Sequence, residues 1–214
     1  MQKKIKSVII YLLGLFITAL GVCFSIISSL GVTPSSSTPY VVSIITNIEL
    51  GTCTTLVLIS FVILQIIILG KDFKKKDLLQ IIAGSVFGSL ITLAEFITSG
   101  IQTSDIYFVN LFYCGVGVIF IALGVMLYLS PKILSLPAEG LMQAVAFKFK
   151  LPIPTAKIIC DCSLVILASI LSLIFLGNIT GLREGTVISA VFVGLCMKLF
   201  NKLFGKQLND FLNK

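Results

Sequence analysis

Long apolar runs alternate with short polar or basic segments along almost the whole chain. A helix needs about 20 apolar residues to cross the hydrocarbon core of a bilayer. Because lipid offers no partner to an unpaired backbone group, each crossing segment is expected to be helical. The pattern predicts an all-α polytopic membrane protein with six transmembrane helices, at about residues 8–30, 52–69, 78–98, 107–129, 157–176 and 186–203.

Two segments break this pattern with polar residues and prolines. They are residues 31–48, interrupted by Pro34, and residues 130–149, interrupted by Pro137. The apolar run that ends each segment is too short to span a membrane. We therefore expect each to contain a half-helix that is re-entrant or lies at the membrane interface.

A repeat is visible at an offset of 103 residues. The motif Ala19-Leu20-Gly21-Val22 recurs as Ala122-Leu123-Gly124-Val125, and Pro34 aligns with Pro137. This predicts two membrane repeats, residues 1–103 and 104–214. Each would hold three spans, an odd number, so the second copy would enter the membrane from the opposite side. Many secondary transporters have such inverted repeats, although a duplicated scaffold without a transport role would show the same pattern.

The cations lie in clusters between the apolar runs. With six spans, Arg183 would lie on the outer side of the membrane, and all the lysine clusters would lie on the opposite side. Because positive residues are retained on the cytoplasmic side, both termini are predicted to be cytoplasmic. The lysines are Lys3, Lys4, Lys6, Lys71, Lys74, Lys75, Lys76, Lys132, Lys148, Lys150, Lys157, Lys198, Lys202, Lys206 and Lys214.

Composition agrees with a membrane protein and argues against catalysis. Hydrophobic residues make up 57% of the chain and charged residues 12%, far below the roughly 25% of soluble domains. The net charge of +7 forms no aromatic-interleaved patch, so nucleic acid is not an expected partner. The chain has no histidine, and its six cysteines lie within or beside apolar runs. We expect no enzyme activity, no catalytic residues, no metal site and no cofactor.

The strongest candidate binding residues stand at the two broken segments. Helix N-termini present unpaired N–H groups and partial positive charge, so they attract polar and anionic groups. The first N-terminus carries hydroxyls and the second a carboxylate: Ser35, Ser36, Ser37, Thr38 and Glu139. Helix capping explains the same hydroxyls without a ligand.

Four charged residues are further candidates. Asp161 lies within a predicted span, where ionisable groups are costly and often functional. Lys157 is four residues earlier on the same helix face and could neutralise it. Arg183 and Glu184 open the last span, where they form either a self-paired capping turn or a carboxylate- or phosphate-binding group.

These motifs resemble the YczE/YyaS/YitT family of bacterial integral membrane proteins. The residues that carry the resemblance are Ala19–Val22, Leu30–Pro34 with Ser37–Tyr40, Leu136–Gly140, Lys157 with Asp161, and Gly181–Thr186. The absence of tryptophan places the chain nearer a Ser/Pro-rich branch. The resemblance implies a protein of the bacterial cytoplasmic (inner) membrane and supplies no substrate.

Three functions fit the sequence. The first is a small-solute transporter or permease-like protein, with the solute between the two halves. The second is a substrate-binding membrane subunit that requires an energising partner. The third is a non-transporting accessory or regulatory membrane protein. The expected partners are membrane lipids, an unidentified small solute, and either a second copy of the chain or an energising subunit.

Overall fold

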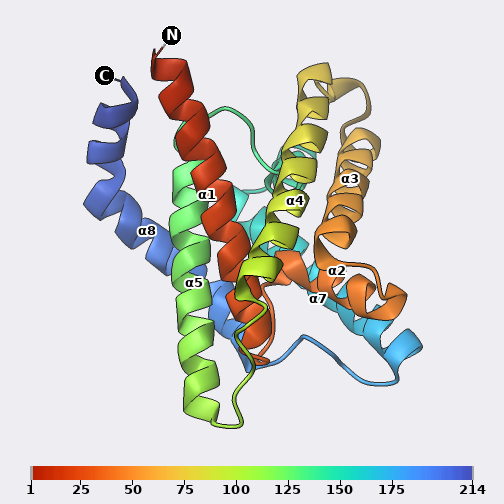
Figure 1. Ribbon diagram of the computed structural model, residues 1–214. Helices are drawn as coiled ribbons and strands as arrows, with labels where there is room; N and C mark the ends of the chain where they lie inside the picture. Colours follow the sequence, from red (N-terminus) through yellow and green to blue (C-terminus); the bar gives the residue numbers. More distant parts are fainter. Residues whose placement is uncertain (1, 214) are drawn as a thin grey trace. The chain divides into compact units, whose positions relative to one another are not determined.

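The computed structural model describes residues 2–213, and every regular element in that range is a helix (Figure 1). Six helices are long and apolar enough to cross a membrane, which confirms the predicted membrane fold. They are α1 (Gln2–Ile27), α3 (Leu50–Leu69), α4 (Gln80–Thr98), α5 (Tyr107–Leu129), α7 (Ile153–Leu176) and α8 (Glu184–Asn213). Two short helices are α2 (Pro34–Thr46) and α6 (Pro137–Phe149), and two 3-10 turns, η1 (Gly70–Asp72) and η2 (Lys75–Leu79), connect α3 to α4.

The observed helix ends differ from the predicted ones at several places. Both short helices begin at their prolines, so residues 35–38 belong to the first turns of α2 rather than to a preceding loop. Proline favours the first turn because its missing N–H is not needed there. Helix α8 continues ten residues beyond the predicted limit at Leu203. Of the C-terminal cations, Lys214 lies outside the described residues.

Large apolar side chains cover much of the surface. Phe108, Phe96 and Ile67 are 78%, 77% and 71% exposed. In water such a surface would drive aggregation, whereas lipid solvates it, so the chain is an integral membrane protein. Of the cysteines, Cys23, Cys53 and Cys114 are buried and Cys162 is exposed.

Two compact units make up the fold, and both draw on the two halves of the sequence. Unit 1 comprises residues 1–33, 93–133 and 183–214. Unit 2 comprises residues 34–92 and 134–182. Unit 2 therefore contains both short helices, α2 and α6, together with α3, α7 and most of α4.

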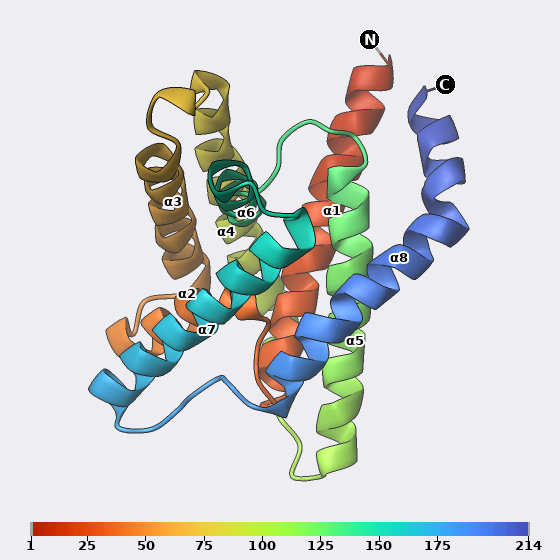
Figure 2. The ribbon, with the colours of Figure 1, turned by 180° about the vertical axis from the view of Figure 1, so that it is seen from behind.

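Unit 1 is built on the close packing of α1 against α5. A Cβ on Gly14 would meet the Gly124 carbonyl oxygen, and one on Gly21 would meet the Gly117 carbonyl oxygen. These pairings run in opposite sequence directions, so α1 and α5 are antiparallel, as Figure 1 shows. Small residues allow helix backbones to approach closely in a membrane, and these glycines have that role between α1 and α5. Helix α8 packs on α5 in the same unit (Figure 2).

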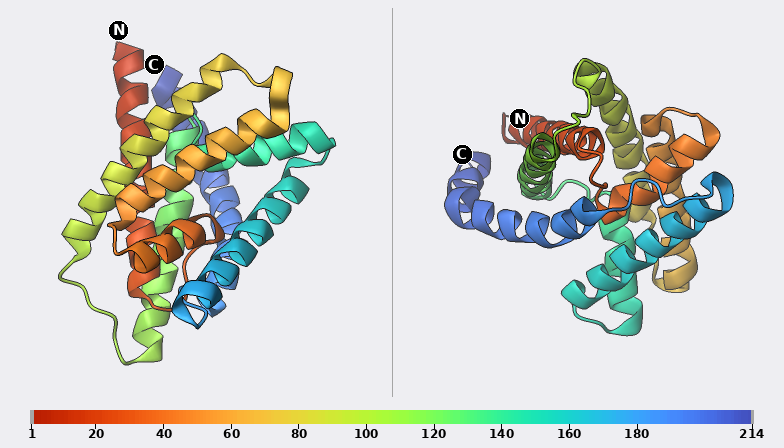
Figure 3. Two further views of the ribbon diagram at one scale, coloured as in Figure 1. Left: turned by 90° about the vertical axis from the view of Figure 1, so that its right-hand side faces the viewer. Right: turned by 90° about the horizontal axis from the view of Figure 1, so that it is seen from below.

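Unit 2 has a crossed pattern of packing. Helix α2 packs on α7 and on α3, while α6 packs on α3 and on α7. The short helix α6 leads by a tight turn into α7, in teal and cyan in Figure 3. Helices α3 and α4 approach each other through Gly51 and Gly88, where an added Cβ on either would meet the backbone of the other.

The backbone itself recurs at an interval of 103 residues. The two short helices start at Pro34 and Pro137, end at Thr46 and Phe149, and are followed by long helices that start at Leu50 and Ile153. The non-glycine residues with positive φ in the described range form two pairs at the same interval: Ser29 with Lys132, and Asn47 with Lys150. L-residues rarely adopt this conformation, so the coincidence reflects equivalent turns.

Candidate functional site

At the N-terminus of α2, two of the four hydroxyl-bearing residues are buried and two are accessible. Ser37 and Thr38 are buried. The Ser37 hydroxyl donates to the Pro34 carbonyl at 2.7 Å, and the Thr38 hydroxyl donates to the Leu164 carbonyl of α7 at 3.3 Å. Ser35 is exposed and Ser36 half-buried. Ser37 and Thr38 therefore hold the helix in place, and Ser35 and Ser36 face accessible space.

A tyrosine of α2 packs against a glycine of the segment that follows α7. The ring of Tyr40 lies against Gly181, where a Cβ would approach two ring carbons to 2.5 Å. Gly181 also has a φ of 76°, which favours glycine. Burial raises the pKa of the Tyr40 phenol above its ordinary value. Two segments far apart in the sequence thus meet at α2.

The N-terminus of α6 is held by two buried amides that the sequence analysis did not single out. Gln65 of α3 and Gln80 of α4 are 2% and 5% exposed. Gln65 Nε2 donates to Gln80 Oε1 at 3.1 Å and to the Pro137 carbonyl at 3.1 Å. Gly140, in the first turn of α6, has no side chain and leaves room for both amides. Glu139 stands beside it in that turn and is half-buried.

The two N-termini carry different residues at equivalent positions. The 103-residue interval pairs Ser36 with Glu139, and Ser37 with Gly140. The first short helix thus offers a hydroxyl where the second offers a carboxylate. The arrangement can accept and donate hydrogen bonds at α2 and can balance a positive group at α6.

Lys157 and Asp161 form an ion pair near the start of α7. Lys157 Nζ lies 2.7 Å from Asp161 Oδ2, and the two side chains are 55% and 19% exposed. The exposed lysine can reach the membrane surface along its aliphatic stem. The residues therefore interact with each other, and the role of Asp161 as a proton or cation site stays a prediction.

Arg183 and Glu184 belong to unit 1 and interact with the end of α1. Arg183 Nη2 lies 3.1 Å from Glu184 Oε1, and Arg183 Nη1 donates to the Ser29 carbonyl at 3.3 Å. The Gly185 N–H donates to the Leu30 carbonyl at 2.7 Å. These bonds tie the start of α8 to the segment after α1, so Arg183 has a structural role beside any contact with a ligand.

Comparison with known proteins identifies the family. Residues 5–202 match the model of a family described as "Family of unknown function (DUF6198)". The chain belongs to this family. The match spans both short helices and every candidate residue named above, so these features fall within the family's common region. The finer resemblance to the YczE/YyaS/YitT family stays a prediction.

One relative aligns over almost the whole length. A protein of Haemophilus influenzae (strain ATCC 51907 / DSM 11121 / KW20 / Rd), described as "Uncharacterized protein", is 25% identical over 206 residues, which is 94% of this chain and 86% of that protein. No solved structure matches. Among the described residues, no three His, Cys, Asp or Glu side chains cluster in a way that could hold a metal ion.

Proposed function

We propose that the protein is a small-solute transporter of the bacterial inner membrane, permease-like and built from two inverted repeats. The solute would bind at the N-termini of the short helices, with Ser35 and Ser36 of α2 and Glu139 of α6 as contacts. Asp161 would act as a coupling group through its pairing with Lys157. Both termini would lie in the cytoplasm.

The observation that carries this proposal is the recurrence of the backbone at 103 residues, combined with the antiparallel course of α1 and α5. Equivalent helices of two repeats that run in opposite directions are what an inverted duplication requires. Short helices at equivalent positions are the usual place of solute sites in such transporters, because their N-terminal N–H groups face the ligand. The resemblance to a bacterial membrane family supports the location.

The chemistry of the two N-termini suggests a class of solute. A carboxylate at the third residue of α6 and a hydroxyl at the third residue of α2 complement a polar solute that has a cationic or hydrogen-bond-donating group. Helix N-termini add positive potential that would favour an anionic group at the other end of the solute. A zwitterionic or polar neutral metabolite matches both features.

A labelling experiment tests the inverted topology. Asn47 and Lys150 are exposed, follow the two short helices, and share the same backbone conformation. Asn47→Cys and Lys150→Cys are therefore a matched pair, with the unsubstituted protein as the background for its own cysteines. In intact cells, a membrane-impermeant maleimide should label Asn47→Cys, whereas Lys150→Cys should react only after lysis. Equal reactivity of both in intact cells would exclude the inverted repeat.

A second experiment tests solute binding. Purified protein is screened by thermal shift against small metabolites, because a ligand that binds the folded state raises the melting temperature. A hit should lose most of its shift in Glu139→Gln and part of it in Asp161→Asn, and retain it in Asp105→Asn, an exposed carboxylate before α5. Uptake of the hit into proteoliposomes would establish transport.

The other outcomes favour the alternatives. A hit that binds but is not taken up by proteoliposomes would favour a substrate-binding subunit, and co-purification with an ATPase would identify its energising partner. A folded protein that binds nothing in the panel, and functions in cells with Asp161→Asn, would favour an accessory or regulatory role.

A further inference from the structure

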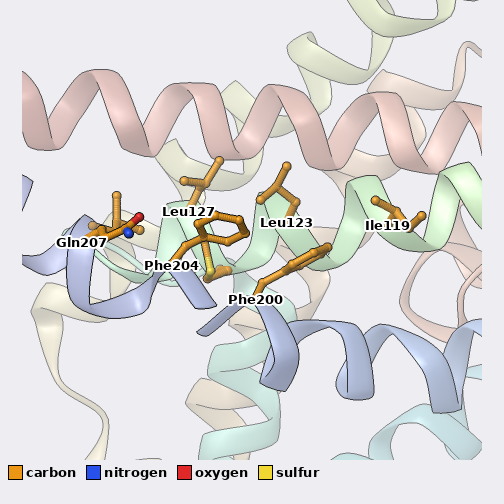
Figure 4. Close-up of a pocket in the computed structure, with 8 residues that line it drawn as sticks. Ile119, Leu123, Leu127, Phe200, Phe204 and Gln207 are labelled. Carbon is orange, nitrogen blue, oxygen red and sulfur yellow. The ribbon is translucent and has the colours of Figure 1, made fainter. Parts of the chain in front are cut away.

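A groove with a volume of about 510 Å³ lies between α5 and α8 in unit 1 (Figure 4). Helix α5 contributes one apolar stripe to it and α8 contributes two aromatic rings. Gln207 is the polar member of the lining. The side chains shown in Figure 4 are Ile119, Leu123, Leu127, Phe200, Phe204 and Gln207.

The residues that line the groove follow one another along the two helices. Residues 119, 123 and 127 are spaced four apart, so they lie along one face of α5. At 1.5 Å per residue this face extends about 12 Å. Figure 4 shows the α8 side chains in matching order, with Phe200 near Leu123 and Gln207 at the end beyond Leu127. An apolar lining that extends along two helices suits a hydrocarbon chain.

Polar and cationic groups gather at the Gln207 end. Phe211 lies one turn beyond Gln207 on α8, and Lys6 Nζ of α1 is 4.9 Å from the centroid of its ring. The ring holds the ammonium group by a cation–π interaction. Lys132 is exposed and follows the end of α5, five residues after Leu127. The lysines at this end, Lys6, Lys132 and Lys206, outnumber its one carboxylate on α8, Asp210. This end therefore carries a net positive charge, while the rest of the groove is apolar.

We infer that this groove is a specific site for an anionic phospholipid. One acyl chain lies between α5 and α8 against Leu123 and Phe204, and the headgroup phosphate lies at Lys6 and Gln207. Lipids on a smooth helix face exchange without regard to headgroup, whereas a recess that ends in fixed cations selects a negative one. The site belongs to unit 1 and does not depend on the proposed solute transport.

The absence of tryptophan from the chain allows a single-reporter test. Phe204→Trp places an indole in the groove, and Leu195→Trp places one on an exposed position of α8 outside it. Each variant is reconstituted in vesicles containing increasing fractions of a lipid with brominated acyl chains, either anionic or zwitterionic. Phe200→Trp serves as the reporter if Phe204→Trp does not fold.

The site predicts a headgroup preference at the groove alone. Phe204→Trp should reach half-maximal quenching at a several-fold lower fraction of the anionic than of the zwitterionic brominated lipid, whereas Leu195→Trp should respond equally to both. Adding Lys6→Gln and Lys132→Gln should abolish the preference. Equal quenching of Phe204→Trp by both lipids, or a preference that survives loss of both lysines, would overturn the proposal.

Discussion

The short helices α2 and α6 follow the same backbone course with different side chains. Each has 13 residues, begins with proline, and ends before a residue with positive φ. In α2 the first turn is held by its own hydroxyls, since Ser37 bonds to Pro34 within the turn. In α6 the first turn is held from outside, by Gln65 of α3. The backbone path is shared, and the chemistry of the two N-termini is not.

One difference between the two short helices accounts for much of this contrast. Gly140 occupies the position of Ser37, and the absence of its side chain admits the buried amides of Gln65 and Gln80. A hydroxyl there would occupy the space that the amides fill. At this position α2 has a local hydrogen bond from Ser37, beside the separate bond from Thr38 to α7. At the equivalent position α6 depends on the amides of Gln65 and Gln80. Substitutions at the two positions should therefore differ in their cost.

The largest effect is expected for Gly140→Val. A Cβ at this position would collide with Gln80 Oε1 and would approach the oxygen and the nitrogen of the Gln65 amide to 2.7 and 2.9 Å, so the amide pair must move. Overpacking combined with a lost buried hydrogen bond should lower the free energy of unfolding by about 3 kcal/mol. Unfolding in mixed micelles, followed by circular dichroism, measures this.

The matched control is Ser37→Ala in α2. It removes a hydrogen bond within one turn and creates no steric conflict, so it should cost about 1 kcal/mol or less. Equal costs at the two positions would contradict the distinction between local and tertiary support.

The next largest effect is expected for Gln65→Leu. This change removes two hydrogen bonds and leaves the Gln80 amide and the Pro137 carbonyl without this donor, at a cost of about 2 kcal/mol. Because a buried polar group costs more when its partner is lost, Gln65→Leu with Gln80→Leu should be less destabilised than the sum of the single variants. A double-mutant cycle by the same unfolding assay measures the coupling, and additive costs would show that the amides act independently.

A smaller effect is expected for Thr38→Val, the corresponding tertiary contact of α2. Valine retains the shape of threonine and removes the 3.3 Å hydrogen bond to the Leu164 carbonyl. The bond is longer than those of Gln65, so its loss should cost about 1 kcal/mol. The melting temperature of Thr38→Val should therefore lie between those of the wild type and Gln65→Leu. A larger loss than in Gln65→Leu would show that the tertiary contact of α2 is stronger than that of α6.

The features that the sequence predicted are those that depend on local pattern. The six spans follow from apolar length, and the breaks at Pro34 and Pro137 follow from the fixed geometry of proline. Helix α8 was predicted too short because polar residues such as Lys206, Gln207 and Asp210 lower the hydropathy beyond Leu203. Lysine has good helix propensity and can extend its charge toward water, so the helix continues.

The amide pair could not be predicted in the same way. Gln65 and Gln80 are uncharged, so a search for ionisable groups in the membrane passes over them, and the bond from Gln65 reaches 72 residues along the chain to Pro137. The signal available was a glutamine inside an otherwise apolar span. The sequence also did not predict that each unit draws segments from both halves of the chain. That division depends on long-range helix pairing rather than on any local pattern.

The smallest effect, and one of opposite sign, is expected at the turns that end the two short helices. Lys150 and Asn47 have φ values of 53° and 55°, where a Cβ is unfavourable by about 1–2 kcal/mol but asparagine is tolerated better than most residues. Glycine removes that strain and adds entropy to the unfolded chain. Lys150→Gly should therefore raise the free energy of unfolding by about 0.5 kcal/mol, and Asn47→Gly should leave it nearly unchanged.

Lys150→Ala, which keeps the Cβ but removes the charge, separates strain from electrostatics. If Lys150→Ala stabilises as much as Lys150→Gly, the benefit comes from removing the lysine, and the equivalence of the two turns loses this energetic support.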